Sequence, residues 1–94
     1  MALKDEVKLE LRIKTVTFDS EIDGLIAEAK MKIKLCGVLA TLVDTPDALI
    51  SRAIKLYCKA NFGLNNEDSD KYEKSFNALV THLTLCSEYT EEVV

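Results

Sequence analysis

Apolar side chains recur at three- and four-residue steps along most of this chain, a spacing that places them on one face of an α-helix. The clearest case lies between Asp44 and Gly63. The apolar positions there form a stripe wide enough to be buried on more than one side, and they are Leu49, Ile50, Ala53, Ile54, Leu56, Tyr57, Ala60 and Phe62. This pattern predicts a core helix over residues 46–62.

Both ends of the 46–62 helix carry residues suited to helix termini. Pro46 fits the first helical position, because a proline lacks only an N–H that would be unpaired there, and Thr45 precedes it as a cap. Asp47 follows in the first turn, where the helix dipole favours negative charge. Gly63 can take the left-handed conformation that closes a helix.

Two more stretches show the helical period. The run from Ser20 to Asp23 resembles a capping box, and the apolar stripe behind it predicts a helix over residues 20–36. Beyond a polar segment, where Asp68 or Ser69 is the candidate cap, another stripe predicts a helix over residues 69–87. The two stripes are Ile22, Leu25, Ile26, Ala29, Ile33 and Cys36, and Tyr72, Phe76, Leu79, Val80, Leu83 and Cys86.

The N-terminal residues 4–14 fit two periods. Apolar and charged residues alternate there as in a strand, yet Leu3, Val7 and Leu11 also fall on one helical face. Acidic residues at the start and basic residues at the end match a helix dipole. We therefore favour a helix over residues 4–13 and keep a strand as the alternative.

These patterns predict an all-α fold in a single domain over residues 1–94. One proline and three glycines are too few for the many tight turns of a β-sandwich or barrel. The β-branched segment Thr15–Asp19 is expected to be an extended connector. The expected elements are four short helices, over residues 4–13, 20–36, 46–62 and 69–87, followed by a C-terminal arm.

Charge and hydropathy exclude some functions. The net charge is −4 and the isoelectric point is near 4.9, so the chain lacks the cationic field that drives binding to phosphate backbones. The longest apolar run, Leu35–Val43, is half the length of a membrane span, and the N-terminus has no apolar signal core. We expect a soluble protein that is not secreted and reads no specific nucleic-acid sequence.

Candidate catalytic or metal chemistry is sparse. The only histidine, His82, has Cys86 at i+4, but no third ligand follows at metal spacing and the two positions share a core face by default. Cys36, Cys58 and Cys86 form no CxxC pair, and we interpret them as reduced core residues. We predict no catalytic, cofactor-binding or metal-binding residues.

Two segments are candidates for contact with other subunits. The connector 37–44 is unusually apolar for an exposed loop, so its side chains either cover the core or meet another subunit. The acidic C-terminal segment has nothing evident to hold it within a monomer and is a frayed end or an arm. The candidate interface residues are Val38, Leu39, Leu42, Val43, Glu88, Tyr89, Thr90, Glu91, Glu92, Val93 and Val94.

The order of these features resembles the head–tail connector (adaptor) family of tailed bacteriophages. The run Glu6–Ile13 (EVKLELRI) is similar to the "EVKxxLRI" helix with which that family commonly opens, and Asp19–Ala29 (DSEIDGLIAEA) matches "DxxIxxLIxxA". Pro46 then leads a helix after a variable loop, as in the family. The segment Tyr72–Tyr89 resembles the last helix of some members from phages and prophages of Gram-positive bacteria. The connector 35–44 matches no family pattern.

This resemblance implies a structural virion protein at the head–tail junction, assembled in the host bacterial cytoplasm. The expected partners are the phage portal protein, a stopper or tail-completion protein, and sister copies in a ring, implied to be dodecameric like the portal. The C-terminal arm would then reach a neighbouring subunit or the portal. An alternative is a small phage-encoded helical regulator that binds a host protein or DNA, and gene neighbourhood would distinguish the two.

Overall fold

The computed structural model describes residues 3–62 and 67–90, and the described residues fold into helices without any strand. The all-α prediction is confirmed, and the N-terminal segment contains a helix, as favoured, and not a strand. The helices are α1 (Leu3–Glu10), α2 (Asp19–Leu35), α3 (Ala40–Asp44), α4 (Ala48–Asn61), α5 (Ser69–Thr84) and α6 (Ser87–Thr90).

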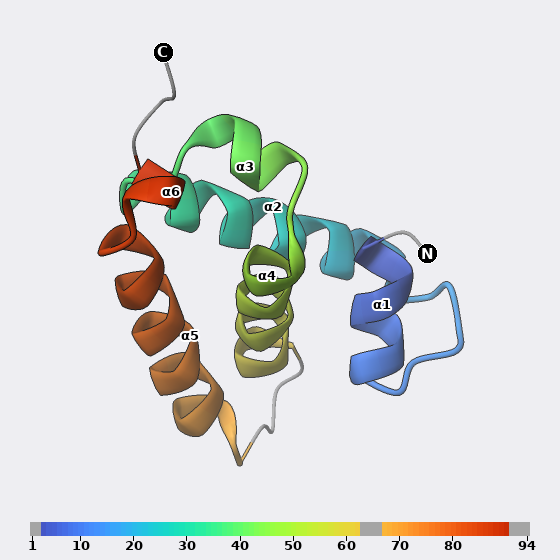
Figure 1. The fold of residues 1–94 in the computed structure, drawn as a ribbon. Coiled ribbons are helices and arrows are strands. Elements are labelled where there is room, and N and C mark those ends of the chain that lie inside the picture. Colours follow the sequence, from blue (N-terminus) through green and yellow to red (C-terminus); the bar gives the residue numbers. More distant parts are fainter. Residues whose placement is uncertain (1–2, 63–66, 91–94) are drawn as a thin grey trace.

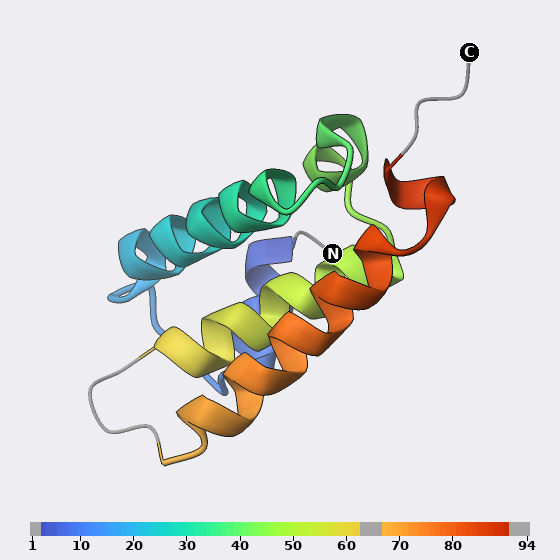
Figure 2. The same cartoon turned by 90° about the vertical axis from the view of Figure 1, so that its left-hand side faces the viewer.

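Helix α4 is the centre of the molecule. Helices α1 and α5 lie on opposite sides of it, and α2 crosses over it (Figure 1). Figure 2 shows α5 running alongside α4 over most of its length. The predicted burial of α4 on more than one side is therefore confirmed, and its buried residues are Ile50, Ala53, Ile54, Leu56, Tyr57, Cys58 and Ala60.

Two helices end in a Schellman motif, which closes the helix with a left-handed residue. Helix α1 stops at Glu10 instead of residue 13, because Arg12 adopts φ 58° and the Ile13 N–H donates to the Lys8 carbonyl at 2.9 Å. Helix α2 ends in the same way at Gly37, with φ 112°. A glycine takes this conformation without strain, whereas arginine does so rarely.

The predicted caps of the second and third helices were wrong in detail. Helix α2 begins at Asp19, its N-cap residue is Phe18, and no side chain of a capping box closes it. Helix α4 begins after Pro46, and its cap is Asp47 instead of Thr45: the Ile50 N–H donates to Asp47 Oδ1 at 2.9 Å. Aspartate is among the strongest N-cap residues.

The predicted fourth helix is divided. Its main part, α5, ends at Thr84, because the N–H groups of Leu85 and Cys86 bond to carbonyls three residues back and tighten the last turn. A separate short helix, α6, follows. The predicted loop 37–44 likewise contains a helix, α3, and the segment 15–18 forms turns and bends instead of an extended connector. The predicted cap Gly63 lies outside the described residues.

Gly24 is a helix-interior residue with no structural requirement for glycine. A Cβ added there would meet nothing within 4 Å, and its φ is not in the left-handed region. We expect Gly24→Ala to raise the free energy of unfolding by about 0.5 to 1 kcal/mol, the usual advantage of alanine inside a helix. Urea denaturation followed by circular dichroism at low protein concentration checks this. A loss of stability would contradict the open space that the structure shows around a Cβ at position 24.

Candidate assembly interface

The structure divides the predicted interface residues of the 37–44 connector into two groups. Val38 and Val43 are buried, with 3% and 0% of their surface exposed, so they cover the core. Leu39 and Leu42 are half-buried, and Leu42 packs against the same core. The sequence left open whether the connector covers the core or meets another subunit. In the structure, Val38 and Val43 cover the core.

The C-terminal residues up to Thr90 are held on the body of the protein. The Leu39 N–H donates to the Tyr89 carbonyl at 2.8 Å, and the Tyr89 hydroxyl donates to Asp47 Oδ2 at 2.6 Å. The expectation that nothing holds this segment within a monomer was therefore wrong for Glu88, Tyr89 and Thr90, which lie in α6. The remaining arm residues, 91–94, lie outside the described residues.

Asp47 joins two helices of the chain, α4 and α6. One carboxylate oxygen caps α4 and the other accepts from α6. Desolvation opposes ionisation of Asp47, but the bonds from the Ile50 N–H, the Tyr89 hydroxyl and the Leu49 N–H outweigh it and lower the pKa of the carboxyl. The same bond to Asp47, together with desolvation, raises the pKa of Tyr89 to about 12.

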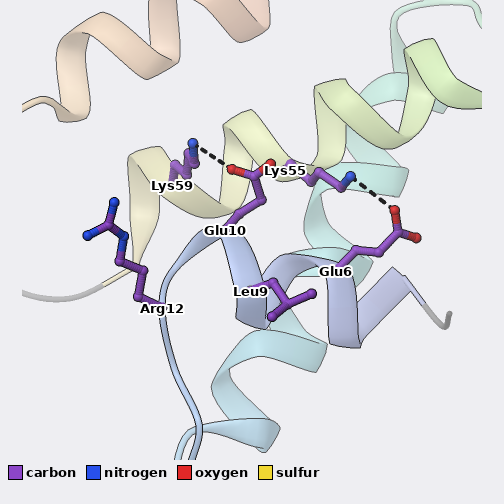
Figure 3. Close-up of a pocket in the computed structure, with 6 residues that line it drawn as sticks. All are labelled: Glu6, Leu9, Glu10, Arg12, Lys55 and Lys59. Atoms are coloured by element: carbon purple, nitrogen blue, oxygen red, sulfur yellow. Dashed lines mark hydrogen bonds and ion pairs between the residues drawn. The ribbon is translucent and has the colours of Figure 1, made fainter.

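A second feature, which the sequence interpretation missed, is a charged hollow between α1 and α4. It has a volume of about 700 Å³ and is lined by Glu6, Leu9, Glu10, Arg12, Lys55 and Lys59 (Figure 3). Two ion pairs bridge the helices there: Glu6–Lys55 at 3.1 Å and Glu10–Lys59 at 2.9 Å. Glu6 and Glu10 are four residues apart, and so are Lys55 and Lys59. This matching spacing on two helices was the sequence signal for the two ion pairs.

The hollow is suited to contact with a partner surface and not to acid–base chemistry. Each of its carboxylates has a lysine partner, and the bond from Lys59 lowers the pKa of Glu10 against the effect of desolvation. A general acid would need its pKa raised toward neutrality. Leu9 lies between the two ion pairs with 64% of its surface exposed, which places an apolar side chain at the centre of a charged face (Figure 3).

The structure places the histidine and the three cysteines in different environments. His82 is exposed and Cys86 is half-buried, with 3.9 Å between Nε2 and Sγ, so the expected shared core face was wrong. Cys36 is exposed, and of the three cysteines only Cys58 lies in the core, where burial raises the pKa of its thiol to about 12. Within residues 3–62 and 67–90, no group of three or more His, Cys, Asp or Glu could hold a metal ion.

No helix in the described part of the chain is long and apolar enough to cross a membrane. A comparison with protein-family models matched one family, described as "Phage connector protein", over residues 3–90. Comparisons with curated proteins and with solved structures returned no significant match. The matched region spans every helix described above, from α1 to α6. The chain therefore belongs to the phage connector protein family.

Proposed function

We propose that this protein is an adaptor at the head–tail junction of a tailed phage, where copies form a ring beneath the portal and receive a stopper or tail-completion protein.

 The observation that carries this proposal is the match to the connector family along residues 3–90. The expected ring has twelve copies, as the resemblance to adaptors implies.

The distribution of exposed apolar residues supports a ring. A cyclic ring needs two different contact surfaces on each copy, because each subunit meets its neighbours head to tail. Leu9 on α1 and Leu85 beyond α5 are 64% and 81% exposed, and α1 and α5 flank α4 on opposite sides (Figure 1). These two exposed leucines would give each copy an apolar contact on each of the two sides that a ring requires.

Electron microscopy of the protein mixed with its cognate portal tests the proposal. We expect an added ring of density beneath the portal, with twelve copies. Portal particles that remain bare at saturating protein concentration would contradict the adaptor role. A matched control uses the portal of an unrelated phage, which should remain bare.

The arm residues 91–94 are proposed to contact a neighbouring copy or the portal. Deleting residues 91–94 should leave the free energy of unfolding unchanged but weaken binding to the portal, measured by co-sedimentation. Deleting residues 88–94 should also destabilise the monomer, because it removes the bonds of Tyr89 to Leu39 and Asp47. If the protein without residues 91–94 bound the portal as tightly as the full chain, these residues would not be part of the interface.

A further inference from the structure

We propose that the outer face of α2 binds the same face of a second copy of this chain, with the two helices antiparallel. The α2 seam, as we name this face, consists of Ser20, Gly24, Ala27, Met31 and Leu35. The proposal goes beyond the adaptor function and does not depend on it, since it concerns how the free protein associates.

The α2 seam is exposed and has the spacing of a helix-packing surface. Its residues follow one another at steps of four, three, four and four, the spacing at which one helix packs along another. All five are exposed, and Met31 and Leu35 have 58% and 78% of their surface open. The opposite face of α2 supplies the core residues Ile22, Leu25, Ala29 and Ile33. Helix α2 lies at the edge of the bundle (Figure 2), so its seam has no helix to cover it among the described residues.

Gly24 indicates a close approach from outside. Nothing within this chain lies within 4 Å of the position its Cβ would take, and its backbone needs no glycine. A glycine inside a helix is destabilising relative to alanine, so the monomer gains nothing from it. A glycine on an exposed seam does let the backbone of a second helix, or a large side chain from it, come close.

The sizes of the seam residues fit a second copy of the same helix. The small residues Ser20 and Gly24 lie in the first half of α2, and the large residues Met31 and Leu35 lie in the second. Positions 24 and 31 are equally far from the midpoint of the seam, and so are positions 20 and 35. An antiparallel pair therefore sets each Met31 against Gly24 of the second copy and each Leu35 against Ser20.

The charges beside the seam fit the same arrangement. The first half of α2 is acidic, with Asp19, Glu21 and Asp23, and the second half is basic beyond the midpoint residue Glu28, with Lys30, Lys32 and Lys34. An antiparallel pair brings Glu21 near Lys32 of the second copy, and Asp23 near Lys30. Some of these groups already have partners in the monomer: Asp23 lies 3.7 Å from Lys4, and Lys32 lies over the Tyr57 ring at 4.9 Å. One like-charge contact remains, between the two copies of Glu28 at the midpoint.

A contact of this symmetry closes at two copies. Such a contact cannot build a ring. We therefore assign it to association of the free protein, separate from the ring contacts proposed at Leu9 and Leu85. A single pair of 17-residue helices is small compared with stable dimer interfaces, so dissociation constants in roughly the micromolar range are expected.

Sedimentation velocity over a concentration series tests the dimer, using the full chain under reducing conditions. We expect a monomer–dimer equilibrium that Met31→Asp shifts at least tenfold toward monomer. Leu85→Asp is the matched control, because Leu85 is still more exposed but lies away from α2. A wild-type protein that is monomeric up to millimolar concentration, or an equal loss of dimer in the control, would overturn the proposal.

Disulfide cross-linking tests the antiparallel register. In a Cys36→Ser, Cys86→Ser background, the double variant Gly24→Cys, Met31→Cys should oxidise to a covalent dimer, while neither single cysteine variant should. A link within one chain is excluded, because residues seven apart on a helix are about 10 Å apart, beyond the reach of a disulfide. A covalent dimer from either single variant would indicate a parallel or different pairing and overturn the proposed register.

Charge reversal gives an independent check. Glu21→Lys and Lys32→Glu should each weaken the dimer several-fold, and the two together should restore it, because the pair is reversed in both copies at once. Failure of the double variant to recover would show that these side chains do not meet. Glu28→Gln should strengthen the dimer, since it removes the like-charge contact at the midpoint.

Discussion

Replacing Ile54 by alanine should lower the free energy of unfolding by about 3 kcal/mol, within the range measured for large-to-small changes at fully buried sites. Ile54 is fully buried on α4, the helix that contacts α1, α2 and α5. Because α4 packs against several helices at once, we expect the cavity left by truncation not to collapse easily. A domain of this size is typically stable by about 5 to 14 kcal/mol in total, so the change is a large fraction of what holds it folded.

Urea denaturation followed by circular dichroism measures this effect. The midpoint should fall while the slope with urea stays the same, because the surface exposed on unfolding hardly changes. Leu49→Ala is the matched control on the same helix: Leu49 is 42% exposed, so its truncation should cost less than about 1 kcal/mol. Ile54→Val should fall between the two, at about 1 kcal/mol. Equal losses at Leu49 and Ile54 would contradict the central position of α4.

The long helices could be predicted from the sequence because each buries an apolar stripe, and burial is the main source of helix stability in a folded protein. Their ends were harder to place. Cys36 continues the stripe of α2 in sequence, but the left-handed Gly37 ends the helix and leaves the thiol exposed. Arg12 ends α1 in the same conformation without the glycine that would signal it.

The short helices α3 and α6 carry too little local signal to be predicted. Segments of five and four residues are not stable helices alone and depend on contacts with the rest of the fold. Val43 secures α3 by complete burial, and Tyr89 secures α6 by its bond to Asp47, 42 positions earlier in the chain. No spacing rule connects residues so far apart. The apolar character of the connector 37–44 left two uses open, burial or contact with another subunit, because it fits both. Only the fold shows that Val38 and Val43 are buried.

Replacing Asp47 by alanine should lower the free energy of unfolding by about 2 kcal/mol, from two losses. Removing an N-cap typically costs about 1 kcal/mol, and α4 would lose the bond from the Ile50 N–H. Removing the acceptor of the Tyr89 hydroxyl should cost about another 1 kcal/mol, at the low end for a bond to a charged group because this site is exposed to solvent.

Two variants separate these losses. Asp47→Ser keeps a capping side chain but is too short to reach the Tyr89 hydroxyl, and Tyr89→Phe removes that hydroxyl alone. Each should cost about 1 kcal/mol, and the double variant should cost little more than either, which is the sign of a shared interaction. Additive losses would show that the bond between Asp47 and Tyr89 contributes nothing. Hydrogen exchange gives a local measurement: in Tyr89→Phe, the Leu39 N–H, which bonds to the Tyr89 carbonyl, should lose protection while amides of α4 keep theirs.

The effect of Asp47 should also depend on pH, with a sign set by its lowered pKa. Because the carboxyl is ionised more readily in the folded protein, its contribution is fully present above its ordinary value of 3.8 and is lost as the pH falls below that value through the folded pKa. Tyr89 affects stability at the alkaline end of the pH range. Its pKa is raised to about 12, so its contribution is lost only as the pH rises from about 10 toward 12. The stability difference between wild type and Asp47→Ala should therefore be constant from pH 5 to 9 and shrink in acid. A difference that instead grew as the pH fell from 5 to 3 would show that the carboxyl is stabilised in its protonated form, and the joint between α4 and α6 would then need another explanation.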